Sequence, residues 1–204
     1  MEVLEKYFDI SVEQKLLFEE FKKLFISWNS KINLVSRKDI EFFDTKHLLH
    51  SLTLAKFIDF KQSSIIDVGT GGGLPGLALA IMFPQASFLL IDSTGKKINA
   101  VQDMISELGL KNVKAMKIRS NDLQQKYDYI VARAVTNFPN FHLSVKHLLK
   151  KGKAGTKKNG IIYLKGGDFN EELKNFKSNI TVKNISDYFS EEFFETKKII
   201  HYSM

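Results

Sequence analysis

The feature that most constrains this chain is a glycine-rich turn directly after a short apolar run. The run Ser64–Val68 leads into the sequence DVGTGGGLPG, which covers Asp67 to Gly76. Glycine tolerates backbone conformations that other residues avoid, so such a turn can bend sharply and approach a ligand closely. Pro75 has the fixed φ of a first helical turn, and the helix start that follows presents free N–H groups suited to an anionic group. The sequence therefore predicts a strand, a ligand-binding turn and a helix.

Short apolar runs and helical patterns alternate along the following hundred residues. Further strands are expected at four runs of this kind: Ser87–Asp92, Val113–Ile118, Tyr127–Ala132 and Gly160–Lys165. Helices are expected between them: Leu77–Phe83, Lys96–Leu108 and Phe138–Leu149. This alternation is typical of a parallel sheet covered by helices on both faces. Ile180–Tyr188 and Phe193–Tyr202 are rich in β-branched and aromatic residues, which predicts a closing antiparallel pair.

The first part of the chain carries helical patterns only. Ser11 with Gln14 three residues later forms a capping box, which predicts a helix that runs from there to about Asn29. Asp39 is expected to cap a second helix with a broad apolar face that extends to Phe57.

Length and composition limit the class of protein. The 204 residues, 44% of them hydrophobic, suit one core-forming domain with a modest appendage. We therefore expect a helical amino-terminal extension at residues 1–60 and an α/β domain at residues 61–204. The chain has no cysteine, which excludes disulfides and a thiol nucleophile. It has neither a secretory signal nor an apolar stretch long enough to span a bilayer, so we expect a cytoplasmic protein without membrane contact.

Positive charge is concentrated in the second part of the chain. The formal net charge is +7, yet residues 1–60 hold nine Lys or Arg against ten Asp or Glu, and residues 129–167 hold no acid at all. The basic loop Lys150–Gly160 is compatible with a solvated lysine face or with a phosphate-contacting surface. Affinity for nucleic acid rests largely on Lys and Arg that neutralise phosphates. The loop therefore supplies three expected RNA contacts: Lys150, Lys151 and Lys153.

The glycine turn by itself leaves the ligand open. Gly71, Gly73 and Gly76 also satisfy the dinucleotide fingerprint G-x-G-x-x-G. Asp92 ends the next predicted strand, where an acid that binds a ribose is expected with a dinucleotide or with S-adenosylmethionine. Asp67 before the turn, and the lack of room for a separate substrate domain, favour S-adenosylmethionine. A turn that serves only to join a strand to a helix is the third alternative.

Six motifs follow one another in order between Trp28 and Gly167: SWNSKINLVS, His47-x-x-His50-Ser51, DVGTGGGLPG, DSTGKK at Asp92–Lys97, Arg133-Ala134 and Lys165-Gly166. In order and spacing they resemble the bacterial small-subunit rRNA guanine-N7 methyltransferases of the GidB/RsmG type. The chain departs from that pattern at His50, where the family usually has Asp, and at Asn121, where it usually has Glu.

The resemblance implies the class I methyltransferase fold, a Rossmann-like and mostly parallel seven-stranded sheet, with S-adenosyl-L-methionine as cofactor. The residues it implies for cofactor binding are Asp67, Gly69, Gly71, Gly73, Leu74, Asp92, Ser120, Asn121 and Arg133. Arg133 and Lys165, at the ends of two neighbouring strands, are further expected RNA contacts and the candidate catalytic residues. The implied substrate is N7 of a guanine in 16S rRNA, within a small-subunit ribosomal particle. We expect the protein to act as a monomer.

The residue types also limit which atom can be methylated. Pyrimidine C5 methylation usually passes through a cysteine adduct, and the chain has no cysteine. Asn137-Phe-Pro139-Asn140 does not match the motif of exocyclic-amine methyltransferases. Guanine N7 carries a lone pair and no proton, so its methylation needs alignment rather than a general base. The alternatives are a methyltransferase for another RNA base or a small molecule, and a nucleotide-binding regulator without activity. His47 and His50 lack a third ligand, so no metal is expected.

Overall fold

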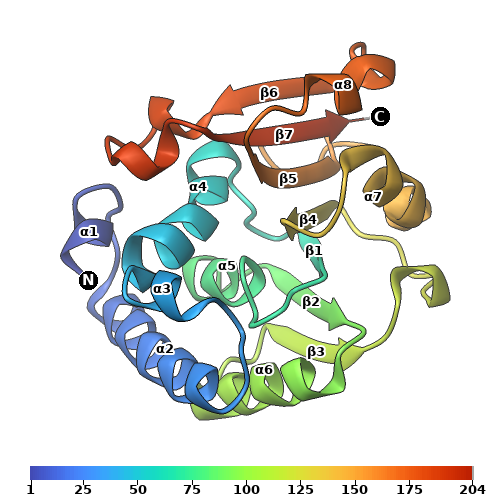
Figure 1. The fold of residues 1–204 in the computed structure, drawn as a ribbon. Helices are drawn as coiled ribbons and strands as arrows, with labels where there is room; N and C mark the ends of the chain where they lie inside the picture. The colour runs from blue at the N-terminus through green and yellow to red at the C-terminus, as the bar shows by residue number, and fades with distance from the viewer. Residues whose placement is uncertain (204) are drawn as a thin grey trace.

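The computed structural model describes residues 1–203, in which one seven-stranded sheet lies between two layers of helices (Figure 1). The strands are β1 (Ser64–Val68), β2 (Ser87–Asp92), β3 (Val113–Lys117), β4 (Tyr129–Arg133), β5 (Gly160–Gly166), β6 (Ile180–Asn184) and β7 (Lys197–Ser203). Their order is β3-β2-β1-β4-β5-β7-β6. Strands β1 to β5 are parallel, and β7 runs antiparallel to both β5 and β6. The predicted α/β class and the closing antiparallel pair are confirmed.

The helices also follow the predicted alternation. The α-helices are α1 (Glu2–Glu5), α2 (Val12–Lys31), α3 (Arg37–Ile40), α4 (His50–Phe57), α5 (Gly76–Met82), α6 (Gly95–Glu107), α7 (Phe138–Val145) and α8 (Asn170–Leu173). A π-helical segment, η1 (Phe43–Leu49), leads into α4. Short 3-10 turns are η2 (Ser120–Asp122), η3 (Lys146–Leu148), η4 (Lys174–Phe176), η5 (Ile185–Asp187) and η6 (Glu192–Phe194). None of the helices within residues 1–203 has the length and apolar character of a membrane span.

The two predicted helix caps had different outcomes. The capping box of α2 is confirmed, because the Gln14 N–H donates to the Ser11 hydroxyl at 3.2 Å and the Ser11 N–H donates to the Gln14 amide oxygen at 3.1 Å. The prediction that Asp39 caps a second helix is wrong. Ser36, three residues earlier, accepts the Asp39 N–H at 3.2 Å and caps α3, so Asp39 lies inside that helix. The predicted second helix is therefore divided into α3, η1 and α4.

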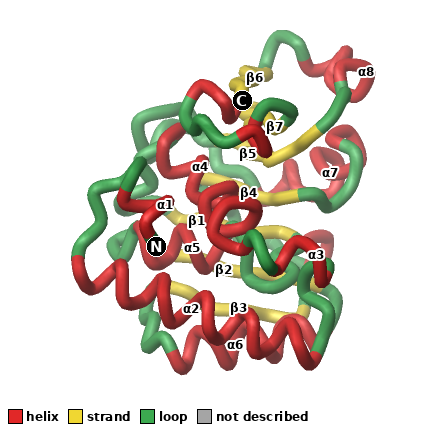
Figure 2. Tube along the Cα trace, turned by 60° about the vertical axis from the view of Figure 1, so that its left-hand side comes forward, coloured by secondary structure: helices red, strands yellow, loops and turns green. Residues whose placement is uncertain are grey.

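Helices lie on both faces of the sheet (Figure 2). Each face is covered by its own apolar cluster. One cluster joins α2, α4, α5 and α6 to the sheet, and it includes Phe25 of α2 and Leu77 of α5. The other contains Phe138 and Phe141 of α7 packed against Tyr163 of β5. The helices of residues 1–60 therefore pack on the same face as α5, directly beside the glycine turn.

The parallel strands give the sheet two different edges. Ser64 pairs with Ser87 in register, so β1 and β2 begin at one edge and end at the other. The loops that follow β1, β2 and β4 lie at the carboxyl edge, where open α/β sheets bind ligands. The loop that precedes β5 lies at the amino edge, where the Lys150 N–H donates to the Tyr127 carbonyl and the Gly155 N–H donates to the Tyr129 hydroxyl.

Candidate active site

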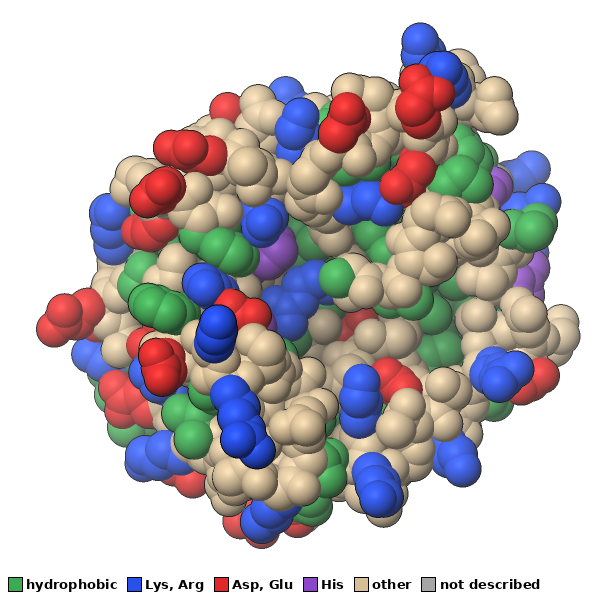
Figure 3. Space-filling model, viewed as in Figure 1, with side chains coloured by type: hydrophobic (Ala, Val, Ile, Leu, Met, Phe, Trp, Pro, Cys, Tyr) green, Lys and Arg blue, Asp and Glu red, His purple; other side chains and the backbone are tan. Residues whose placement is uncertain are grey.

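Two cavities lie next to each other at the carboxyl edge of the sheet. The first has a volume of about 420 Å³ and the second of about 430 Å³, and Ala134, Val135 and Thr136 line both. Figure 3 views the molecule from the side of this edge and shows a hollow in the middle of the surface, with cationic and histidine side chains inside it. Because one short loop borders both cavities, molecules bound in them would be immediate neighbours.

The loop that the two cavities share is held by one tyrosine. The hydroxyl of Tyr163 accepts the N–H groups of Val135 and Thr136 at 2.8 and 2.9 Å and donates to the Thr136 carbonyl at 2.7 Å. Ala134 has a φ of +53°, in the left-handed region that residues other than glycine rarely adopt. Strain of this kind clusters at functional sites. Sequence reasoning missed Tyr163, because nothing in β5 distinguishes it from a tyrosine that only fills the core.

The first cavity contains four of the predicted cofactor residues. Gly69, Asp92, Ser120 and Asn121 all line it, with apolar walls from residues that include Ile91, Ile118 and Phe141. Such a mixture of apolar surface and a few fixed polar groups is typical of a small-molecule site. The structure thus brings together residues from three separate strand ends, as the sequence predicted.

Gly69 and Gly71 have different structural requirements within the turn. Both have a positive φ, +73° and +58°. A Cβ on Gly69 would lie 2.8 Å from Cγ2 of Val135, whereas a Cβ on Gly71 would meet nothing within 4 Å. Gly69 therefore allows the loop after β4 to approach the turn closely, and Gly71 meets a backbone requirement only.

Asp92 is held at the wall of the first cavity by backbone donors. Its carboxylate accepts the Gly71 N–H at 3.0 Å and the Thr94 N–H at 2.8 Å. A carboxylate has about four acceptor positions, so these two bonds fix its orientation and leave capacity for hydroxyl groups of a ligand. Lys97, which lines the same cavity, was not predicted as a site residue.

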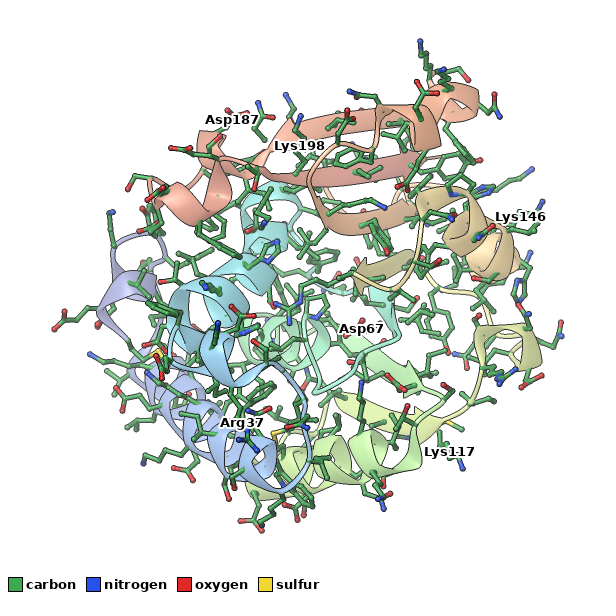
Figure 4. The ribbon with its side chains drawn as sticks, in the orientation of Figure 1. Arg37, Asp67, Lys117, Lys146, Asp187 and Lys198 are labelled. Carbon is green, nitrogen blue, oxygen red and sulfur yellow. The ribbon has the colours of Figure 1, made fainter. Side chains whose placement is uncertain are left out.

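Asp67, Gly73 and Leu74 lie behind the turn and line neither cavity. Asp67 is fully buried and accepts the Thr70 hydroxyl at 2.7 Å and the Gly76 N–H at 2.8 Å. A Cβ on Gly73 would overlap a leucine of α5, and Leu74 belongs to the apolar cluster. Figure 4 labels Asp67 near the middle of the face, where β1 leads into α5. In this structure the three residues shape the turn from beneath.

The carboxyl group of Asp67 is ionised with difficulty. Burial raises its pKa to about 6, although its hydrogen bonds with Thr70 and Gly76 and the charge of Arg133 act in the opposite direction. Its second oxygen, Oδ1, has no hydrogen-bond partner among residues 1–203. Asp67 is therefore partly protonated near neutral pH, and its main contacts are with the turn itself.

Arg133 is one of three cationic residues that line the second cavity. The guanidinium of Arg133 donates to the His47 carbonyl at 3.3 Å, and within residues 1–203 no carboxylate lies at salt-bridge distance from it. Burial lowers the pKa of Arg133 to about 10, with Asp67 opposing the shift, so the group stays charged. A guanidinium has five N–H donors, and most of those of Arg133 are available to a ligand.

Lys165 and Lys197 line the same cavity from β5 and β7. The Nζ of Lys165 is 2.7 Å from a Glu172 carboxylate oxygen, whereas Lys197 lies over the Phe193 ring at 4.9 Å from its centroid. Arg133 and Lys165 are thus brought together as predicted. Lys197 was not predicted, because only the antiparallel pairing of β5 with β7 places it there.

The lysines of the basic loop lie elsewhere. Lys150 donates to the hydroxyl of Ser64, the first residue of β1, and its Nζ is 3.5 Å from an Asp128 carboxylate oxygen. Lys151 and Lys153 are exposed in the same loop. The three lysines therefore lie at the amino edge, across the sheet from both cavities, and their contact with RNA stays a prediction.

Solved structures of low sequence identity share the fold. A precorrin-6y C5,15-methyltransferase from Geobacter metallireducens is 12% identical with a TM-score of 0.58, over 85% of this chain and 92% of that one. A SAM dependent methyltransferase from Aquifex aeolicus is 18% identical with a TM-score of 0.54, over 82% of this chain and 98% of that one. At these identities the likeness concerns the fold alone, and it supports the class I assignment.

Relatives of much higher identity match nearly the whole chain. A protein of Flavobacterium psychrophilum named ribosomal RNA small subunit methyltransferase G is 48% identical, over 98% of this chain and 96% of its own length. A protein of Christiangramia forsetii with the same name is 46% identical, over 100% and 97%. Residues 14–200 match the family profile described as GidB, rRNA small subunit methyltransferase G. The resemblance seen in the motifs is confirmed, and the chain belongs to the GidB family.

Proposed function

We propose that the protein transfers the methyl group of S-adenosylmethionine to N7 of a guanine in 16S rRNA. The observation that carries this proposal is the pair of adjoining cavities that share Ala134, Val135 and Thr136. One combines apolar walls with an oriented carboxylate, and the other is lined by cations. The name of the close relatives supports small-subunit rRNA, rather than a small molecule, as the substrate.

The first cavity fits S-adenosylmethionine. The apolar walls suit the adenine ring, with Ser120 and Asn121 beside it, and the oriented carboxylate of Asp92 suits the ribose hydroxyls. Gly69 keeps the passage beside Val135 open, because a larger residue would close it. We propose that Asp67, Gly73 and Leu74 serve the cofactor indirectly, through the shape of the turn.

The second cavity fits the acceptor. When bound, S-adenosylmethionine would supply an electrophilic methyl group: the lone pair of guanine N7 would form the new bond to it as the methyl–sulfur bond breaks and S-adenosylhomocysteine leaves. The chain therefore needs no general base, and its contribution is to hold donor and acceptor in line. Arg133 lines only the second cavity, so we assign its charge to the RNA rather than to the cofactor. Tyr163 keeps the loop between the two molecules in one conformation.

A larger cationic surface surrounds the cavities. Cationic residues near the carboxyl edge that have no salt bridge within residues 1–203 include Arg37, Lys38, Lys97, Lys117, Arg119 and Lys198. Figure 4 labels Arg37, Lys117 and Lys198 on different sides of Asp67. Unpaired cations of this kind bind phosphates and release counterions. We propose that the rRNA backbone lies on this surface.

The substrate that we propose is the small-subunit particle rather than isolated RNA. Cationic residues lie at both edges of the sheet, which suits a target larger than one hairpin. Both cavities are formed within one chain, so a monomer suffices. We place its action in the cytoplasm, where bacterial ribosomes are assembled, and we take residues 1–60 as an extension that supports the glycine turn.

The test uses 16S rRNA and small subunits from a strain that lacks the gene. Incubation with S-adenosylmethionine and the purified protein is expected to produce N7-methylguanosine, detected by nucleoside mass spectrometry. The Gly69→Asp variant, which places bulk and charge on the turn, is expected to produce none. Wild-type protein that binds S-adenosylmethionine yet leaves the nucleoside profile unchanged would contradict the proposed substrate. Binding of NAD in place of S-adenosylmethionine would contradict the proposed reaction.

A further inference from the structure

His50 is a buried histidine that the transfer reaction does not explain. It is only 6% exposed, it begins α4, and it lines the second cavity. The rings of Phe193 and Phe194 pack against it in edge-on contacts, with centroid distances of 5.6 and 6.0 Å. Its Nε2 is buried without a hydrogen-bond partner among residues 1–203. A buried polar atom left unpaired costs about 1–3 kcal/mol, so it needs an explanation.

The surroundings of His50 determine the charge of its ring and which ring nitrogen carries the proton. The backbone of Lys46 acts on the ring as a hydrogen-bond acceptor that raises its pKa slightly, so we assign the N–H to that side of the ring and the lone pair to Nε2. Burial, together with the charges of Arg133 and Lys197, holds the pKa of His50 well below its usual range. The ring is therefore neutral at physiological pH, and Nε2 is a hydrogen-bond acceptor.

The second cavity thus offers several donors together with a buried side-chain acceptor, Nε2 of His50, that has no partner among residues 1–203. Arg133, Lys165 and Lys197 donate, and Nε2 of His50 accepts. Guanine has the complementary set, since its O6 accepts while its N1–H and N2 amino group donate. Adenine has a donor in place of O6 and an acceptor in place of N1–H, so both of its groups would meet like partners. Guanine N7 lies on the opposite side of O6 from N1, which leaves it free to face the cofactor.

We propose that the second cavity receives the target base and that Nε2 of His50 accepts a hydrogen bond from its N1–H or N2 amino group. His50 is then a residue that selects guanine over adenine. The inference rests on the proposed function, because it assumes that an RNA base enters this cavity. A site built to pair with a substrate N–H discriminates strongly against an analogue that lacks it, because its own buried group is then left unpaired.

His142 provides an internal comparison. Its Nε2 also lacks a partner among residues 1–203, and it packs against the rings of Phe176 and Tyr202 at centroid distances of 5.0 and 4.6 Å. It lines neither cavity. An unpaired nitrogen in an aromatic cluster is therefore not sufficient for the assignment, which depends on the position of His50 at a cation-lined cavity. His142 is the matched control.

The experiment combines variants of His50 with analogues of the target base. His50→Phe keeps the aromatic packing and removes the acceptor, His50→Gln restores an amide oxygen at a similar reach, and His142→Phe is the control. The target nucleotide is first located by mapping N7-methylguanosine made by the wild-type protein. That nucleotide is then replaced by inosine or by 2-aminopurine in semi-synthetic 16S rRNA. The RNA is supplied in the form that the wild-type protein methylates, either as 16S rRNA or within small subunits. Inosine lacks the N2 amino group, 2-aminopurine lacks N1–H and O6, and both retain N7.

Compared with rRNA that carries guanosine at the target position, the wild type and His142→Phe are expected to lose at least tenfold in kcat/KM on one of the two analogues. His50→Phe is expected to be at least tenfold slower on guanosine, with unchanged cofactor affinity. On the discriminating analogue it should show no further loss if that analogue is inosine, and a smaller further loss than the wild type if it is 2-aminopurine, which also lacks the O6 that the cations bind. His50→Gln should regain part of both properties. If the wild type and His50→Phe lose the same factor in kcat/KM on each analogue, the role of His50 is overturned, while the methyl transfer itself is unaffected. A wild type that methylates no rRNA would instead remove the proposed function.

Discussion

The two glycines Gly69 and Gly71 allow a backbone effect to be separated from a steric one. Both lie at a positive φ in the same turn, so an alanine at either position incurs left-handed strain of roughly 1–2 kcal/mol. Only at Gly69 does the new Cβ overlap a neighbour, Cγ2 of Val135, at 2.8 Å. Carbon atoms prefer a separation of about 3.5–4.0 Å, and overpacking of this kind adds about 1–3 kcal/mol. We therefore expect Gly71→Ala to destabilise by roughly 1–2 kcal/mol and Gly69→Ala by roughly 2–5 kcal/mol.

The two variants should differ more in cofactor binding than in stability. Relief of the overlap requires Val135 to move, and Val135 lines both cavities. Because about 1.4 kcal/mol corresponds to a tenfold change in affinity, Gly69→Ala should bind S-adenosylmethionine at least tenfold more weakly than the wild type. Gly71→Ala keeps its N–H bond to Asp92 and should remain within about threefold by the same conversion. Calorimetric titration measures the affinities, and urea unfolding measures the stabilities.

A double variant tests the steric cause directly. In Gly69→Ala with Val135→Ala, the atom that the new Cβ would meet is gone, so cofactor affinity should recover towards that of Val135→Ala alone. The strain at the positive φ is not removed, so about 1–2 kcal/mol of the stability loss should persist. Equal loss of affinity in the two single glycine variants, or no recovery in the double variant, would refute the close approach of the two loops.

Three further predictions concern other parts of the site. Tyr163→Phe removes three hydrogen bonds from the shared loop, so urea unfolding should show a loss of about 1–3 kcal/mol, and single-turnover assays a slower transfer. Because the pKa of Asp67 is raised from 3.8 to about 6, its contribution to stability is fully present below pH 3.8 and is lost as the pH rises through 6. The wild type should therefore lose about 3 kcal/mol relative to Asp67→Asn between pH 3 and pH 8, and a constant difference would contradict the pKa. Replacement of Lys151 and Lys153 by Ala should weaken binding to whole rRNA and reduce its salt dependence, with kcat and cofactor affinity unchanged.

The strands and the glycine turn could be predicted because their signals are local. The five parallel strands begin and end within about two residues of the expected runs. Four of them are mostly buried and consist of short, largely apolar stretches, whereas the edge strand β3 alternates between buried and exposed residues. Gly69 and Asp92 were placed together because each directly follows or ends a strand of a parallel sheet. The cap at Asp39 was mispredicted because Ser36 is also a good acceptor and lies one turn earlier.

The residues missed by sequence reasoning depend on contacts between distant segments. Tyr163 acts on a loop that follows another strand, and Lys197 reaches its cavity through the antiparallel pair β5–β7. His50 was noted as a departure from the family pattern, but its buried lone pair and its cationic neighbours are visible only in the folded chain. Local periodicity carries no information about which strand ends become neighbours.

The basic stretch shows how sequence proximity misleads about function. Arg133, the lysine loop and Lys165 follow one another without an intervening acid, and RNA contacts are expected from all three. However, the loop precedes β5 and Lys165 lies near its end, and a strand of seven residues spans about 20 Å. The charges are therefore divided between an edge that contains the cavities and an edge that does not. Cations beside the cavities can affect the transition state, whereas those at the amino edge can affect only the encounter with the particle, so substitutions in the two groups should separate in kcat and KM.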